Sequence, residues 1–208
     1  MISCQSGGIS VNKAIMLCAE MLTVLLPFAA LCLWRHRTGK ERQPVFAIIL
    51  FALYIFAVFH LTGSGTLHDA LLYGAPRAGQ INLLPFSQEI DAVAYVQNVL
   101  LFVPLGFMLP WLWPQMEKTD VVLYGLGLSL LIELSQLCNN RRTDVDDLIL
   151  NTLGAAAGLA AFCLIGRFLP RAAGGGSRKS AAAYIAVMLL GHFFLYNEFG
   201  LAKMLYGF

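Results

Sequence analysis

Long apolar stretches alternate with short polar segments along this chain of 208 residues. A membrane-spanning helix needs about 20 predominantly apolar residues, and it satisfies its own backbone hydrogen bonds where no water is available. The pattern therefore predicts an all-α polytopic membrane protein with about six transmembrane helices. The predicted helices cover residues 15–34, 45–61, 92–113, 121–137, 148–169 and 181–196.

The third apolar stretch contains three residues that disturb helices, Pro104, Gly106 and Pro110. A proline inside a helix removes a backbone hydrogen bond and usually kinks the helix. Such sites are tolerated at membrane depth where neighbouring protein or water satisfies the freed backbone groups. We therefore predict that the third helix is kinked.

The composition supports a membrane protein. Charged residues make up 12% of the chain, about half the ~25% of an ordinary soluble protein. Hydrophobic residues make up 58%, and the mean hydropathy is +0.70. The lipid bilayer is therefore the main expected partner, and we expect no nucleic-acid partner. The spacing of the five cysteines matches no metal site, so we predict no resident metal.

The chain divides into three predicted regions. Residues 1–44 contain the first helix and a basic cytoplasmic loop, 45–170 form the main membrane domain, and 171–208 contain a Gly-rich linker and the last helix. The longest connection, 62–91, carries an apolar segment at 81–86. This segment is too short to span a bilayer, so we expect it to dip into the interface.

The distribution of basic residues predicts the orientation in the membrane. The loops that follow the first, third and fifth stretches hold nine of the 14 Lys and Arg residues. Cytoplasmic loops carry the excess of Lys and Arg, so these loops are expected inside and both termini outside. The polar loop 139–147 and the long connection 62–91 then share the extracytoplasmic face.

The polar residues at the start of the fifth helix form the main candidate site. At about 100° per residue, several of them fall within one narrow stripe of that helix. This stripe contains Asp144, Asp147, Asn151, Gly154 and Gly158. The last two glycines have the spacing of a close helix contact, and we assign them to helix packing.

Glu133 and Gln136 lie three residues apart on the preceding apolar stretch, so they share a helix face. A charge that faces lipid near the bilayer centre costs at least about 2.5–3.5 kcal/mol. The polar faces of both helices are therefore expected to point inward and to line a common pocket.

A structural interpretation of the same acidic residues is a helix start. Thr143 or Asp144 can cap the helix, and carboxylates in the first turn interact favourably with its dipole. This interpretation explains Asp146, which lies outside the stripe and which we place at an exposed loop edge. We expect Asp146→Asn to be nearly silent. Helix capping does not explain Asn151 and Glu133, which lie deeper in the apolar stretches.

Two kinds of ligand fit these residue types. Arg142 can hold a phosphate or a carboxylate through two parallel hydrogen bonds. Alternatively, the carboxylates can bind a divalent cation through oxygen ligands. No histidine lies near them in sequence, which argues against zinc. Glu20 has no partner that the sequence can name, and His60 and His192 are interpreted as packed or interfacial residues.

Four segments resemble the VanZ-like membrane family, in the same order and at the same spacings. They are Asn82-Leu83-Leu84-Pro85-Phe86, the stretch Asn98-Val99-Leu100-Leu101-Phe102-Val103-Pro104-Leu105-Gly106, the pair Glu133 and Gln136, and the series Arg142, Asp144, Asp147, Asn151, Gly154 and Gly158. The resemblance covers roughly residues 45–170, so we expect this region to be a VanZ-like membrane domain. The first helix, the linker and the last helix lie outside it.

The resemblance implies a bacterial cell-membrane protein related to the teicoplanin-resistance accessory protein. We expect it to bind or remodel components of the outer leaflet, which lowers susceptibility to teicoplanin-type glycopeptide antibiotics. The candidate partners are a lipid-linked cell-wall precursor and the glycopeptide itself. The predicted ligand-binding residues are Asn98, Glu133, Gln136, Arg142, Asp144, Asp147 and Asn151.

Two alternatives of other classes stay open. One is a metal-assisted hydrolase or transferase that acts on a lipid-linked phosphate and needs a divalent cation. The other is a flippase or transporter, although no inverted repeat is visible in the sequence. No catalytic residue is assigned and no cofactor is predicted, so a binding protein is favoured over an enzyme.

Overall fold

The computed structural model describes residues 3–40, 44–75, 79–87, 91–169, 177–197 and 201–206, and in these segments it is almost entirely helical. Arg42, Arg77 and Arg171, which contribute to the predicted charge asymmetry, and the Gly-rich part of the linker lie outside the described residues. The helices are α1 (Ser3–Arg37), α2 (Val45–Thr62), α3 (Leu67–Tyr73), α4 (Ala92–Leu112), α5 (Lys118–Gln136), α6 (Val145–Ile165), α7 (Arg178–Leu195) and α8 (Leu201–Tyr206).

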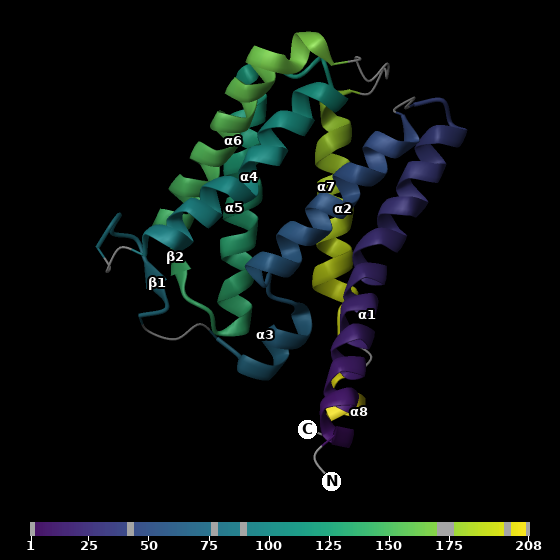
Figure 1. Cartoon of the computed structure of the whole chain (residues 1–208), viewed down its shortest axis with the longest axis vertical. Coiled ribbons are helices and arrows are strands. Elements are labelled where there is room, and N and C mark those ends of the chain that lie inside the picture. Colours follow the sequence, from purple (N-terminus) through teal and green to yellow (C-terminus); the bar gives the residue numbers. More distant parts are fainter. Residues whose placement is uncertain are drawn as a thin grey trace.

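The class predicted from the sequence is confirmed. Within the described residues, five helices are long and apolar enough to cross a membrane: α1, α2, α4, α5 and α6. Helix α7 has 18 residues, as many as α2, and it includes Arg178, Lys179 and His192. It packs along α1 and beside α2, in the position of the sixth helix that we expected (Figure 1).

Helix α4 continues without interruption through the three residues that were expected to disturb it. The hydroxyl of Tyr54 on α2 donates a hydrogen bond to the carbonyl of Leu101, at 2.8 Å, in the turn before Pro104. This bond joins α2 to α4 next to Leu100, whose carbonyl is the one that loses its helical donor at Pro104.

Close backbone contacts join α4 and α6. An added Cβ at Gly154 would lie 2.2 Å from the carbonyl oxygen of Val99, and one at Gly158 would lie 2.0 Å from that of Val103. Gly106 on α4 approaches the carbonyl of Ala155 in the same way. Because only a residue without a Cβ allows this approach, these glycines fix the separation of the two helices.

A short parallel pairing lies at one end of the helices. Strand β1 (Ile81–Asn82) pairs with β2 (Thr143–Asp144), with Asn82 opposite Asp144. This end also carries α3, whereas the C-terminal ends of α1, α4 and α6 lie at the opposite end (Figure 1). The pairing joins the long connection between α2 and α4 to the start of α6, which is where the candidate residues lie.

Candidate functional site

A polar cavity of about 360 Å³ lies at this end of the bundle, between α2, α4, α5, α6 and the loop before β2. Six of the seven predicted ligand-binding residues line it, although they come from three helices and a loop. The lining residues are Leu61, Thr62, Asn98, Ile132, Glu133, Gln136, Arg141, Arg142, Asp147 and Asn151.

The seventh predicted residue, Asp144, lies behind the cavity wall and braces it. Its backbone N–H donates to Oε2 of Glu133 at 3.0 Å, and its side chain caps α6 by accepting from the N–H of Asp146. Both carboxylate oxygens lie 3.1 Å from Nδ2 of Asn82 on β1. Asp144 therefore links the connection between α2 and α4, the start of α6 and Glu133. Its position fits best the helix-cap role that the sequence also suggested.

Two residues on the stripe of α6 form hydrogen bonds with neighbouring helices. Asn98 on α4 donates to Oδ1 of Asp147 at 2.5 Å. Nδ2 of Asn151, one turn further along α6, donates to the hydroxyl of Ser129 on α5 at 3.0 Å. These bonds place Asp147 and Asn151 on one wall of the cavity, one above the other, as their spacing of four predicts.

Helix α5 supplies the facing wall. Glu133 is only 4% exposed, and its backbone carbonyl accepts from the hydroxyl of Thr143 at 3.0 Å. Gln136 donates from Nε2 to the carbonyl of Thr62 at 2.8 Å, which joins α5 to the end of α2. Glu133 therefore points to the cavity with its carboxylate held by Asp144, and Gln136 closes one side.

Both arginines of the loop line the cavity. We expected this for Arg142, whereas Arg141 was not among the predicted ligand-binding residues. Nη1 of Arg141 donates to the carbonyl of Thr62 at 2.5 Å, and its own carbonyl accepts from Nε2 of Gln80 at 2.7 Å. These bonds hold the loop against α2, so that two cationic side chains and two carboxylates share one cavity.

The expected position of Asp146 at an exposed loop edge is wrong. This side chain is 2% exposed. Its Oδ1 accepts from the N–H of Phe86 at 2.8 Å, and its Oδ2 accepts from the hydroxyl of Tyr95 at 2.6 Å. Asp146 is outside the stripe, as its position on the helix requires, but the segment around Phe86 folds over it and buries it.

Sequence reasoning missed three supporting residues, Ser129, Gln80 and Arg141. A signal was present for Ser129, because it precedes Glu133 by four residues and therefore shares its helix face. Gln80 lies in an irregular segment without a period, so nothing in the sequence indicates its contact with the loop.

Within the described segments, no three His, Cys, Asp or Glu side chains come together in an arrangement that could hold a metal ion. Two histidines have polar partners outside the polar cavity. Oε2 of Glu20 on α1 lies 2.8 Å from Nδ1 of His60. Nε2 of His192 lies 3.1 Å from the carbonyl of Ser64.

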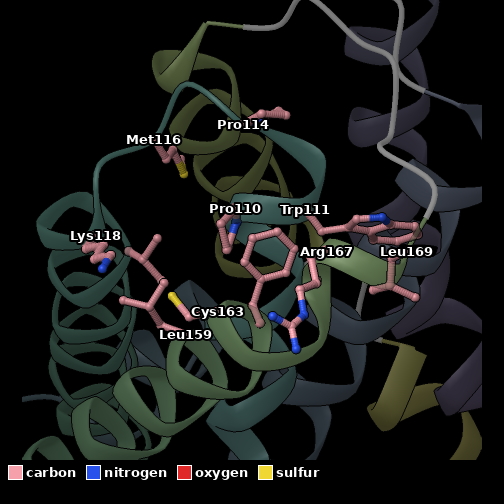
Figure 2. A pocket seen from close by; sticks show the side chains of 12 residues that line it. Pro110, Trp111, Pro114, Met116, Lys118, Leu159, Cys163, Arg167 and Leu169 are labelled. Atoms are coloured by element: carbon pink, nitrogen blue, oxygen red, sulfur yellow. The ribbon is translucent and has the colours of Figure 1, made fainter.

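A larger cavity of about 590 Å³ lies near the C-terminal ends of α4 and α6. Figure 2 shows its lining, which is mostly apolar and includes Trp111 and Cys163, together with the cationic Lys118 and Arg167. None of the predicted ligand-binding residues contributes to it. The polar cavity at the other end is therefore the candidate functional site.

The fold and the cavity define a polytopic α-helical membrane protein whose spanning helices enclose a charged pocket near one end. The VanZ/LLP1 family model matches residues 45–166, so the chain belongs to this family. The matched region contains every residue that lines the polar cavity, whereas α1, α7 and α8 lie outside it.

The chain is similar to Protein VanZ of Enterococcus faecium. The two are 28% identical over 116 residues, which cover 55% of this chain and 72% of that protein. No solved structure matches the chain. The similarity therefore supports the family that the polar motifs indicated.

Proposed function

We propose that this protein acts in the bacterial cell envelope, where it lowers susceptibility to teicoplanin-type glycopeptide antibiotics by binding or remodelling outer-leaflet components. Membership of the VanZ/LLP1 family supports the link to glycopeptides. The ligand class is an anionic headgroup or peptide stem that carries phosphate or carboxylate. The lipid bilayer is the medium from which such a ligand reaches the polar cavity.

The observation that carries this proposal is the polar cavity itself. Polar and charged groups at membrane depth are expensive and mark functional sites by default. Here Arg141 and Arg142 face one cavity together with Glu133 and Asp147. Guanidinium groups recognise phosphate and carboxylate through bidentate hydrogen bonds, and the carboxylates position the arginines and the ligand.

The charge distribution favours an extracytoplasmic position for the polar cavity. The described basic residues Arg35, Arg37, Lys118, Arg167 and Arg178 belong to the helix ends opposite α3 and the strands. Cytoplasmic ends carry the excess of Lys and Arg. The polar cavity then opens on the side where lipid-linked cell-wall precursors and glycopeptides meet.

The test measures teicoplanin susceptibility of a sensitive host that expresses the full chain. Glu133→Gln keeps an acceptor for the N–H of Asp144 but removes the charge, and Arg142→Gln removes the anion-binding guanidinium. We expect both variants to lose most of the protection given by the unmodified protein. The matched controls are Asp120→Asn and Arg178→Gln, since these residues form an ion pair at the other end of the bundle.

Membrane abundance must be equal for all variants by immunoblot. The proposal fails if the unmodified protein does not change susceptibility at normal abundance, or if Glu133→Gln and Arg142→Gln protect as well as the controls. Turnover of a lipid-linked phosphate that requires Mg²⁺ or Mn²⁺ would instead establish an enzyme and contradict the binding function.

A further inference from the structure

One wall of the polar cavity has an unused buried acceptor. Asn151 is 3% exposed, and its amide nitrogen is occupied by the hydroxyl of Ser129 at 3.0 Å. Its amide oxygen, Oδ1, is buried and has no hydrogen-bond partner among the described residues. A buried acceptor left without a donor costs about 1–3 kcal/mol, so this oxygen indicates a donor that arrives with a ligand.

Two carboxylates on the same cavity also keep acceptor capacity. Glu133 receives the N–H of Asp144 on Oε2, and Asp147 receives Asn98 on Oδ1. Among the residues described, their second oxygens, Oε1 and Oδ2, have no such bond. Asp147 and Asn151 are stacked one turn apart on α6, and Glu133 lies on the adjacent α5. The cavity thus offers three acceptors, two of them carboxylate oxygens, to one cationic donor.

A protonated primary amine matches these acceptors. An ammonium group carries one positive charge and three N–H donors, and it has no acceptor of its own. Its three donors match in number the two carboxylate oxygens and the amide oxygen of Asn151 on this lining. No three His, Cys, Asp or Glu side chains among the described residues come together to hold a metal ion.

The cavity also contains cationic groups. Arg141 and Arg142 contribute to the same lining, and their guanidinium groups are suited to phosphate or carboxylate. Leu61 and Ile132 add an apolar part to the wall. A ligand that fits the whole lining must therefore carry an ammonium group, an anionic group and some apolar surface.

We infer that the polar cavity binds a zwitterion, with its primary ammonium on Glu133, Asp147 and Asn151 and its anionic group on the arginines. This inference rests on the proposed function, which supplies the anion, and it adds the cationic half of the ligand. The headgroup of an aminophospholipid has this chemistry, and so does a peptide with a lysine side chain and a free carboxylate. The volume of about 360 Å³ is within the range of small-molecule sites.

The experiment measures binding to the purified full-length protein in detergent by calorimetry. The probes are O-phosphoethanolamine, inorganic phosphate, a lysyl-alanine dipeptide and Mg²⁺ alone. We expect O-phosphoethanolamine or the dipeptide to bind at least about tenfold more tightly than phosphate, because the ammonium adds charged hydrogen bonds. Tighter binding of O-phosphoethanolamine indicates a lipid headgroup as the source, and tighter binding of the dipeptide indicates a peptide.

Variants separate the two halves of the site. Asp147→Asn and Asn151→Leu should lower the affinity for the zwitterionic probes about tenfold or more relative to the affinity for phosphate. Asp120→Asn, a first-turn carboxylate on α5 at the other end of the bundle, should change neither affinity. Thermal unfolding and gel filtration identify any variant that is misfolded, and Asp147→Asn can retain its bond with Asn98.

Three results would overturn the inference. If phosphate and the zwitterions bind with equal affinity, the cavity has no ammonium site, although the anion site of the proposed function is still supported. Binding of Mg²⁺ alone that Asp147→Asn abolishes assigns the acceptors to a metal. If no probe binds, the inference that the cavity binds a zwitterion is refuted. The proposed function is tested separately by antibiotic susceptibility.

Discussion

Replacing Asp146 with alanine should destabilise the protein, although the side chain does not line the polar cavity. The carboxylate is buried and accepts two hydrogen bonds, from the N–H of Phe86 at 2.8 Å and from the hydroxyl of Tyr95 at 2.6 Å. These bonds attach the segment after β1 and the first turns of α4 to the start of α6. Alanine removes both and leaves a buried space.

The size of the effect follows from the charged acceptor. A hydrogen bond to a charged group contributes about 1.5–3 kcal/mol, and Tyr95 is only half-buried, which puts its bond at the lower end. We expect Asp146→Ala to cost about 3 kcal/mol and Asp146→Asn about 1–2 kcal/mol, since an amide oxygen still serves one donor. Tyr95→Phe should cost less than Asp146→Ala, because it removes only one of the two bonds.

A double-mutant cycle tests this explanation. The unfolding of Asp146→Asn, Tyr95→Phe and the double variant is followed in detergent, with the free energy taken from denaturant titrations. Because the two side chains share one bond, the double variant should cost less than the sum of the single variants by about 1 kcal/mol. Asp91→Asn, which alters an exposed cap on α4, is the control. If Asp146→Asn is as stable as the unmodified protein, the burial of Asp146 is refuted and the expectation from the sequence alone was right.

Two further predictions concern packing and topology. Gly154→Ala should destabilise the protein by about 1–3 kcal/mol in thermal or denaturant unfolding, because its Cβ would overlap the carbonyl of Val99. The control Gly127→Ala should be neutral, because a Cβ there meets nothing within 4 Å. Equal stability of both variants would contradict the close contact of α4 and α6. Single cysteines at Ser87 and Asn140 in a cysteine-free chain should react with an impermeant thiol reagent in intact cells, and one at Ser177 should not; the reverse pattern would place the polar cavity on the cytoplasmic side.

The sequence alone determined the class and predicted most of the residues that meet at the polar cavity. Long apolar stretches and a low charge content indicate helices in a bilayer, because a helix forms all its backbone hydrogen bonds within its own segment where no water is available. The spacing of Asp147 and Asn151 predicted a shared helix face, and the cost of exposing Glu133 to lipid predicted that it points inward. The structure brings these three residues to one cavity.

Only the tertiary structure decided what covers each residue. Helical periodicity gives the angle of Asp146 around its own axis, but it carries no information on the segment from Ile81 to Phe86 that buries it. The same segment pairs with β2 and turns Asp144 into a brace for Glu133. That segment has no repeating pattern, so the sequence does not indicate its contacts. The glycine contacts hold α4 against α6, and the bonds from Gln136 and Arg141 hold the end of α5 and the following loop against the end of α2. These contacts appear only when the chain is folded.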